Sequence, residues 1–373
     1  MTHLLSHIKL VFTLVPYAVL VVTLLVFVLR LPLRWRGKLA WAVWLTFCCS
    51  KFLAFRYLGG ETFVPDLPEK LIWFWNWAYS GAMILCALSL VCFFRFRRKG
   101  VCLAAAAWTL SAWGLWSGVK VPAVHEFELE YPDLPVELDG YRIAQLTDLH
   151  ASNAARGWRT KAVVDRANAT GADLICLTGD YVDGEPRKCG EALEPLAELR
   201  AKDGVWAVSG NHEWFGWHDG WWKVYDRLGI RFLSNECVFP RKSLALGGVH
   251  DFRVEVRGGK LKREKYPNVG KAFAAATNGE FRVLLQHQPR AAQTNLEGHG
   301  VRLQLSGHTH GGIMPILSRI VGAANGGFVR GIYRFGTSVL YVSPGCGQWA
   351  GFPMRFFDPS EIAVITLRRK GVK

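Results

Sequence analysis

The sequence lacks the patterns that would indicate a disulfide framework, a cysteine-bound zinc or a nucleic-acid surface. Of its nine cysteines, the four in the last two thirds stand without C-x-x-C spacing, so neither a structural zinc nor a disulfide scaffold is indicated. No internal repeat or low-complexity segment is present, which argues against a repeat architecture. The net charge is +15, but no basic stripe runs through residues 121–373, so no nucleic-acid partner is expected.

Acidic residues are scarce in the first third of the chain. Residues 1–120 contain 13 Lys and Arg but only 3 Asp and Glu, whereas the remaining residues have a net charge of only +5. A chain of 373 residues exceeds the ~250–300 residues at which a single core stops growing. We therefore expect two domains, a transmembrane region at 1–120 and a second domain at 121–373.

Four long apolar stretches lie in the first region, at residues 8–29, 39–57, 71–94 and 101–118. Each is about long enough to cross a hydrocarbon core of ~30 Å. No small-residue cleavage site follows the first stretch, so a removable signal peptide is not expected. We predict about four transmembrane helices and a multi-pass protein of the cell (inner) membrane. Three helices remain an alternative, because the second stretch contains Lys51, whose charged end should extend toward an interface.

The loops between these stretches predict the orientation. The first and third loops are basic, and their basic residues are Arg30, Arg34, Arg36, Lys38, Arg95, Arg97, Arg98 and Lys99. Basic loops stay on the cytoplasmic side. With four spans, the N-terminus and the C-terminal domain are then expected to be extracytoplasmic.

Short apolar runs alternate with helical spacing after about residue 121. The runs at 141–148, 173–180, 204–211, 281–288 and 301–308 are predicted to be buried strands, and segments 158–169, 189–202 and 219–228 helices. This alternation is typical of an α/β domain. Late strands at 339–342 and 362–367 suggest a second, mixed sheet.

Five polar segments end or follow these strands. They are Asp148-Leu149-His150, Gly179-Asp180-Tyr181-Val182-Asp183, Gly210-Asn211-His212-Glu213, His287 and Gly307-His308-Thr309-His310. Ligand sites of open α/β sheets gather at such strand ends. The side-chain period of two is expected to aim Asp148 and His150, and likewise His308 and His310, in one direction. Carboxylates, imidazoles and an amide without thiolates suit Mn, Fe or Zn, and a shared carboxylate such as Asp180 can hold two ions.

These segments resemble, in type and order, the five signature blocks of the calcineurin-like metallophosphoesterase superfamily, and the resemblance covers residues 140–368. It implies a four-layer αββα sandwich and two divalent metal ions. The ligands that it implies are Asp148, His150 and His310 for the first ion, Asn211, His287 and His308 for the second, and Asp180 as the bridge. It also implies that His212 protonates the leaving group and that Asp183 orients His212.

The C-terminal segment YVSPGCGQWAGFPMRF is similar to that of a bacterial membrane-anchored branch that includes UDP-2,3-diacylglucosamine hydrolase-like phosphodiesterases. One position departs from purple acid phosphatases, which have an iron-binding tyrosine three residues after the bridging aspartate. Because Asp183 stands there, a tyrosinate-bound ferric site is not expected.

The expected function is hydrolysis of a phosphoester or pyrophosphate bond by hydroxide that two metal ions generate. Membrane anchoring favours a lipid or lipid-linked substrate. The alternatives are an enzyme for soluble phosphoesters, a membrane sensor that uses the fold for binding, and a transporter or channel with a regulatory phosphoesterase domain.

Two other segments allow two interpretations each. The aromatic residues Trp214, Phe215, Trp217, Trp221 and Trp222 are either packed in the core or form an apolar rim at the membrane. The basic residues Lys260, Lys262, Arg263 and Lys265 are either a solvated loop or a contact for anionic lipid headgroups. His250 and Asp251, after an expected Leu-Gly-Gly turn, lie near the edge of the site and receive no role.

Overall fold

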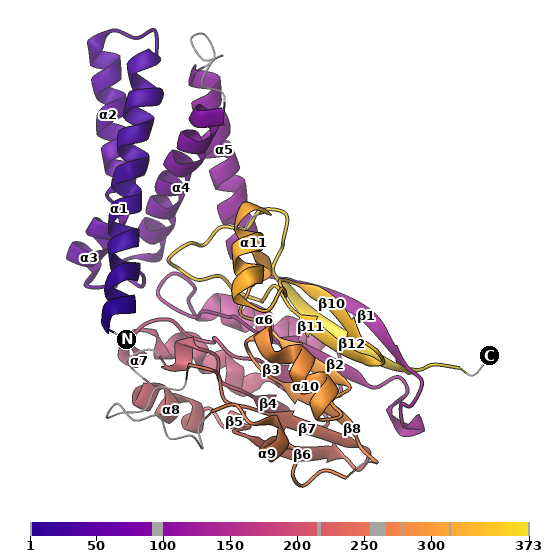
Figure 1. Ribbon diagram of the computed structural model, residues 1–373. Coiled ribbons are helices and arrows are strands. Elements are labelled where there is room, and N and C mark those ends of the chain that lie inside the picture. The colour runs from indigo at the N-terminus through magenta and orange to yellow at the C-terminus, as the bar shows by residue number, and fades with distance from the viewer. Residues whose placement is uncertain are drawn as a thin grey trace. The chain divides into compact units, whose positions relative to one another are not determined.

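The computed structural model describes residues 2–91, 100–214, 218–253, 266–277, 279–312 and 315–371. The chain divides into two compact units (Figure 1). The first comprises Met1–Val119 and Ala350–Met354, and the second Lys120–Trp349 and Arg355–Lys373. The chain therefore leaves the second unit after Trp349, contributes five residues to the first, and returns at Arg355.

The first unit is helical. Its elements are α1 (Thr2–Val26), the 3-10 turn η1 (Val28–Arg30), α2 (Trp35–Cys49), α3 (Lys51–Gly59), α4 (Glu69–Val91) and α5 (Gly100–Val119). Within the described residues, α4 is by itself long and apolar enough to cross a membrane. The stretch 39–57 was expected to be one helix, but it consists of α2 and α3, which are bent by 55° and pass the same test only as a pair.

Lys51 lies at the break between α2 and α3. Its side chain is fully buried, and its Nζ donates a hydrogen bond of 2.8 Å to the carbonyl oxygen of Gly351. The ammonium group also lies 4.5 to 5.5 Å from the ring centroids of Phe52, Phe55 and Tyr79. The expectation that Lys51 extends to an interface is therefore wrong, because a carbonyl and three aromatic faces take the place of water.

The first sheet of the second unit has the order β1-β12-β2-β3-β4-β5. Its strands are β1 (Ala123–Tyr131), β12 (Glu361–Arg369), β2 (Arg142–Leu146), β3 (Leu174–Leu177), β4 (Val205–Ala207) and β5 (Arg231–Phe232). Strands β2 to β5 are parallel, whereas β12 runs antiparallel to β2. The last strand was expected in the second sheet. It lies here instead, because it fills the gap between β1 and β2 and turns Ala363 and Ile365 into the core.

The second sheet has the order β10-β11-β9-β8-β7-β6. Its strands are β10 (Gly331–Phe335), β11 (Ser338–Val342), β9 (Leu303–Ser306), β8 (Phe281–Leu285), β7 (Leu244–Gly248) and β6 (Glu236–Arg241). The four central strands are parallel, and both edge strands are antiparallel. Both sheets are thus mixed, and the predicted α/β class is confirmed.

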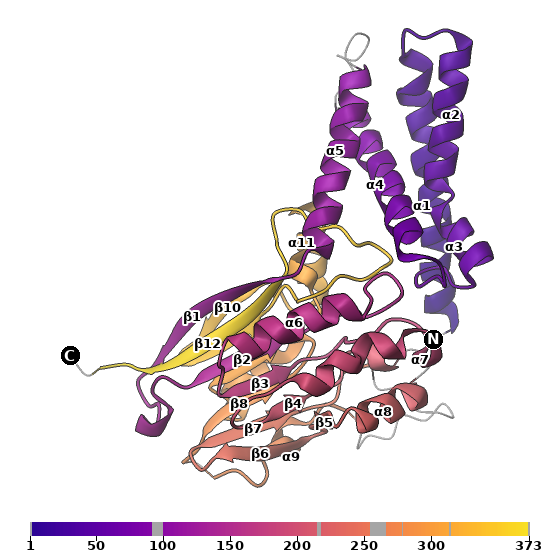
Figure 2. The same cartoon turned by 180° about the vertical axis from the view of Figure 1, so that it is seen from behind.

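Alternating side chains build the layers of this unit. Val283 and Leu285 of β8 enter the core between the two sheets, together with Ile143 of β2. Leu284 points the other way and packs with Leu296 of α10 (Ala292–Gly298). This is the period-two burial that a strand covered on both faces requires. Figure 2 shows α6 (Gly157–Ala169) over the outer face of the first sheet, so helices flank the pair of sheets.

Two segments differ locally from the expectation. The helix predicted at 189–202 is a 3-10 helix, η3 (Gly190–Glu198), preceded by the short helix α7 (Pro186–Cys189). Pro195, which lacks an N–H, lies inside η3. The expected Leu-Gly-Gly turn is part of strand β7. A Cβ on Gly247 would lie 2.5 Å from the Phe273 ring, so the glycine permits close packing rather than a turn. The predicted helix at 219–228 is present as α8 (His218–Arg227).

Candidate metal centre

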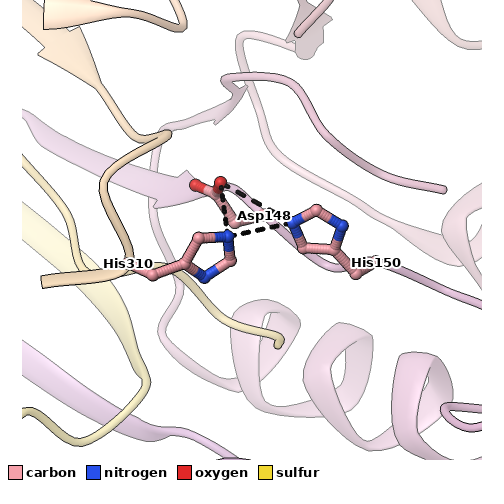
Figure 3. Close-up of side chains that lie close together, drawn as sticks. All are labelled: Asp148, His150 and His310. Carbon is pink, nitrogen blue, oxygen red and sulfur yellow. Dashed lines mark hydrogen bonds and ion pairs between the residues drawn. The ribbon is translucent and has the colours of Figure 1, made fainter. Parts of the chain in front are cut away.

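The first predicted ligand group converges. Asp148 and His150 follow β2, and His310 follows β9 in the 3-10 turn η7 (His310–Gly312). The Nε2 atoms of His150 and His310 are 3.0 Å apart, and Oδ1 of Asp148 lies 3.5 and 3.9 Å from Nε2 of His310 and His150 (Figure 3). Ligands about 2.1 Å from a tetrahedral ion lie about 3.4 Å from one another. The three buried side chains therefore have the spacing of a single cation's ligands.

A second group shares the neighbouring carboxylate. Asp180 follows β3, and its Oδ2 lies 3.1 Å from Nε2 of His287 and 4.0 Å from Nε2 of His150. His287 and His308 follow β8 and β9, and ligand atoms of Asp180, His287 and His308 all lie within 4.8 Å of one another. Asp180 thus lies between the two groups, within reach of both.

Two atoms of this cluster show that the residues fit metal ions. Nε2 of His287 and Oδ1 of Asn211 are buried and have no hydrogen-bond partner among the described residues. Nε2 of His287 nevertheless lies at the ion-pair distance of 3.1 Å from Oδ2 of Asp180, so Oδ1 of Asn211 is the stronger indication of the two. A buried polar atom left without a partner costs about 1 to 3 kcal/mol. A cation would satisfy both atoms, and both belong to residues predicted for the second ion.

The backbone conformation of the ligands is unusual. Among the described residues, seven residues other than glycine have positive φ, and five of them are predicted ligands: Asp148, His150, Asp180, His308 and His310. This left-handed conformation is costly for L-residues and clusters at functional sites. We expected the alternation of side chains along a strand to point Asp148 and His150, and likewise His308 and His310, in one direction. This expectation is wrong, because β2 ends at Leu146 and β9 at Ser306, before these residues begin. Tight turns beyond the strands orient these side chains instead.

Two glycines allow the turns to approach one another. A Cβ on Gly210 would lie 2.2 Å from Oδ1 of Asp180, and a Cβ on Gly307 would lie 2.3 Å from Oδ2 of Asp148. Atoms cannot approach this closely, so any larger residue would displace a carboxylate. The glycines beside the predicted ligands thus permit close approach of the backbone.

Asp183 connects two histidines. One carboxylate oxygen lies 2.5 Å from Nδ1 of His212, and the other lies 3.1 Å from Nδ1 of His150. A carboxylate that accepts from Nδ1 fixes the tautomer and the ring orientation, leaving Nε2 for the site. Burial opposes protonation of His212, but Asp180 and Asp183 raise its pKa to about 9. The two carboxylates therefore favour the protonated form of His212.

Charges within the cluster suit metal binding at His308 and His310, whereas Asp180 raises the pKa of His287 well above its usual range although burial opposes this, so a metal ion would displace a proton there. Burial and the neighbouring His287 lower the pKa of His308 to about 3, and burial and His150 hold the pKa of His310 well below its usual range. Neutral imidazole is the form that binds a metal. Burial disfavours the charged form of Asp180, but His287 and His212 hold its pKa well below the usual range. This carboxylate is thus ionised and available to cations.

Two buried charged residues support the site and were not assigned from sequence. The Glu213 carboxylate accepts hydrogen bonds from the backbone N–H groups of Asp180, Tyr181 and Gly210, at 3.0, 2.8 and 2.6 Å. It thereby joins the turn that carries Asp180 to the turn that carries Asn211. Its only signal in the sequence is its place at the end of the Gly-Asn-His-Glu segment.

The other is Arg355, whose guanidinium donates to the carbonyl oxygens of Pro344 and Gly347 and lies 3.4 Å from Nδ1 of His310. Arg355 is the one charged residue in the apolar segment 349–357, which is a signal that sequence reasoning passed over.

The aromatic residues after His212 are packed. Trp214 and Trp221 are buried, and their indole N–H groups donate to Oγ of Ser209 and the carbonyl oxygen of Gly184. The interpretation as a membrane rim is therefore wrong for these two residues. Phe215, Trp217 and the basic run at 260–265 lie outside the described residues.

Comparisons with known proteins identify the family. The Calcineurin-like phosphoesterase family matches residues 141–312. An uncharacterized metallophosphoesterase of Helicobacter pylori is 33% identical over 259 residues, which are 69% of this chain and 67% of the relative. The chain belongs to the calcineurin-like metallophosphoesterases. The predicted family is thus confirmed, and the chain is a metal-dependent phosphoester hydrolase.

Other metallophosphoesterases match over similar spans. The Bacillus subtilis metallophosphoesterase YkuE is 30% identical over 280 residues, which are 72% of this chain and 96% of YkuE. A Danio rerio protein described as a transmembrane protein with metallophosphoesterase domain is 30% identical over 287 residues, 74% of this chain and 63% of that protein. The descriptions of these relatives do not mention UDP-2,3-diacylglucosamine hydrolysis, so the assignment of this chain to that branch stays a prediction.

Proposed function

We propose that this metallophosphoesterase hydrolyses a phosphoester or pyrophosphate bond at a centre of two divalent ions, Mn, Fe or Zn. The first ion would be held by Asp148, His150 and His310, the second by Asn211, His287 and His308, and both by Asp180. The supporting observation is the convergence of two ligand groups, buried except for the partly exposed His308, on either side of the Asp180 carboxylate.

Two residues near this centre, His212 and Asp183, would act in proton transfer. When bound, the two ions would supply an acidified water and positive charge beside the phosphoryl oxygens. His212 is held by Asp183 through its Nδ1, and its Nε2 would donate a proton to the leaving oxygen. Asp183 is then a positioning residue, which keeps His212 charged and correctly turned.

The helical unit supports a membrane location. Large apolar side chains of its helices are exposed, among them Leu14, Val21, Leu25, Val43, Leu90, Val101, Leu110 and Trp116. Such a surface is unfavourable in water and suits lipid. The Danio rerio relative, named as a transmembrane protein, agrees with this location. We infer a multi-pass membrane region at 1–120, an extracytoplasmic catalytic domain at 121–373 and a lipid or lipid-linked substrate.

The function is tested with the full-length protein in detergent. Hydrolysis of lipid phosphates, soluble phosphomonoesters and soluble phosphodiesters would be measured with Mn, Zn or Mg, and with EDTA. We expect metal-dependent hydrolysis that is highest on a lipid phosphate and is lost in Asp180→Asn. Full activity of Asp180→Asn, or in EDTA, would contradict the shared-carboxylate centre. Higher activity on soluble esters would contradict only the lipid preference, and a reporter fused after Lys373 that is active only in the cytoplasm would contradict the orientation.

A further inference from the structure

A pocket lies at the opposite end of the first sheet from the metal centre. Its volume is 660 Å³, and it is lined by residues that shortly precede β3, β4 and β5 and by the first residues of β4 and β5. These three strands are parallel, and Asp180 and Asn211 follow the ends of β3 and β4. The pocket and the centre therefore lie at opposite ends of the same strands, and the described residues that line the pocket include no proposed metal ligand.

Glycines at the turns keep this pocket open. The chain turns toward β4 at Gly204 and toward β5 at Gly229, with φ of 97° and 69°, which glycine adopts at little steric cost. A Cβ on Gly229 or on Gly171, which also lines the pocket, would have no heavy atom of another part of the chain within 4 Å. The volume lies within the range of about 300 to 1,000 Å³ that is typical of small-molecule sites.

The pocket combines an apolar floor with a basic rim. The floor includes three leucines whose side chains are buried, Leu196, Leu199 and Leu228. The rim includes three exposed basic residues, Arg200, Lys202 and Arg231. None of the described residues that line the pocket is acidic or aromatic. A ligand that fits both parts has an apolar body and a negative charge.

The charges of the rim are not neutralised within the described part of the chain. Two acidic residues, Glu198 and Asp203, belong to the same lining segment, but both have other partners. The Glu198 carboxylate lies 3.4 Å from Nζ of Lys161. The Asp203 carboxylate accepts hydrogen bonds from the hydroxyl of Tyr141 at 2.7 Å and from Nε of Arg241 at 2.5 Å. No described residue forms an ion pair with the three basic residues of the rim, so their mutual repulsion favours a bound anion.

We propose that this pocket binds an organic anion with an unbranched aliphatic body, such as an alkyl carboxylate or sulfonate. The charged group would lie at the basic rim and the alkyl chain on the leucine floor, where burial of its CH₂ groups is favourable. A nucleotide fits less well, because a base stacks on aromatic side chains and the described lining residues include none. The proposal does not rest on the proposed function, since the pocket is separate from the metal centre.

The test measures binding of octane-1-sulfonate by calorimetry to the full-length, Mn-loaded protein in a neutral detergent, with the heat of protein-free micelles subtracted. This probe has a permanent charge and no ester bond that the enzyme could cleave. The rim variant combines Arg200→Gln, Lys202→Gln and Arg231→Gln. The control variant removes the same charge at exposed positions outside the pocket and combines Lys271→Gln, Arg319→Gln and Arg334→Gln. We expect at least tenfold weaker binding in the rim variant, because it loses three exposed ionic contacts, and affinity within threefold of the parent protein in the control.

The apolar part of the pocket is tested separately. Hexane-1-sulfonate should bind about tenfold more weakly than octane-1-sulfonate, because it buries two CH₂ groups fewer. The cation octyltrimethylammonium should bind at least tenfold more weakly than the octyl anion. Ala197→Trp places a large side chain in the pocket from an exposed position and should also weaken binding at least tenfold, whereas Ala275→Trp, exposed outside the pocket, should not.

Three results would overturn the proposal. The first is equal affinity of the rim variant and the parent protein for octane-1-sulfonate. The second is equal affinity for the octyl anion and the octyl cation, which would indicate an apolar contact surface instead. The third is loss of binding in Asp180→Asn together with full binding in the rim variant, which would place the anion at the metal centre. A parent protein that binds octane-1-sulfonate as expected but hydrolyses no phosphoester would contradict only the proposed function.

Discussion

The pair formed by Asp183 and His212 gives the sharpest prediction about mechanism. His212 is proposed to donate a proton from Nε2, and Asp183 accepts from its Nδ1 at 2.5 Å. Replacing Asp183 by Asn removes a negative charge and presents an amide to the imidazole. The proton on His212 should then be held less tightly, so the acid form is lost at a lower pH.

The size of the effect follows from the pKa of His212. Burial alone would lower this pKa, but Asp180 and Asp183 raise it from 6.5 to about 9, which corresponds to about 3.4 kcal/mol at 1.36 kcal/mol per unit. Three carboxylates share this effect, Asp180, Asp183 and Glu213, and Asp183 acts through both its charge and its hydrogen bond, so it accounts for roughly 1 unit. A raised histidine pKa means that the acid is present below it and is lost as pH rises through it. Bound cations lower the pKa of parent and variant alike, so the difference remains.

The assay is the pH dependence of kcat/KM with an alkyl phosphate, whose poor leaving group requires protonation. The alkaline limb should move down by about 1 pH unit in Asp183→Asn at saturating metal, and it should move much less with a nitrophenyl ester. His212→Ala should lower kcat about 100-fold or more on the alkyl substrate and keep its metal.

In the double variant, Asp183→Asn should have little further effect on the alkaline limb, because its action passes through His212. An alkaline limb that stays in place in Asp183→Asn would refute this reasoning, as would a full additional loss in the double variant.

Three further predictions concern the architecture of the centre. Glu213→Gln turns an amide NH₂ toward backbone N–H groups and leaves at least one of them unpaired. The free energy of unfolding, measured in thermal melts, should therefore fall by about 1 to 3 kcal/mol, and by less in Tyr225→Phe. Equal melting temperatures of Glu213→Gln and the parent protein would contradict this prediction. Gly210→Ala forces the Asp180 carboxylate aside and should remove at least one of two bound metals in elemental analysis, whereas Gly298→Ala, with open space around it, should keep both. EDTA should lower the melting temperature, and added Mn should restore it, since a ligand at 100 times its Kd stabilises by about 2.7 kcal/mol; a melt indifferent to both would count against a bound metal.

Much of the α/β unit was predictable because its strands are short, apolar and bounded by Gly or Asp. Segments such as Leu174–Leu177 and Leu303–Ser306 are buried on both faces, and their composition shows it. The sequence also showed which polar residues follow each strand. It did not show how they converge, because contacts between loops that are distant in the chain bring them together, such as the hydrogen bond from the backbone N–H of His308 to the Asp148 carboxylate.

Buried charges were the least predictable feature. Lys51 was expected at an interface, but a carbonyl oxygen from residue 351, 300 positions away, meets its Nζ. Glu213 and Arg355 were passed over for the same reason, since their partners are backbone groups that only the folded chain brings near. The placement of Glu361–Arg369 between β1 and β2 likewise depends on a gap in the first sheet that no local pattern reveals.

The central claim is that one carboxylate, Asp180, is shared by two cations. Anomalous diffraction from crystals of the Mn-loaded protein tests it most directly. We expect two peaks about 3.5 to 4 Å apart, both within bonding distance of Asp180, one beside His150 and His310 and the other beside His287 and His308. A single peak, or a second peak that Asp180 does not reach, would contradict the account.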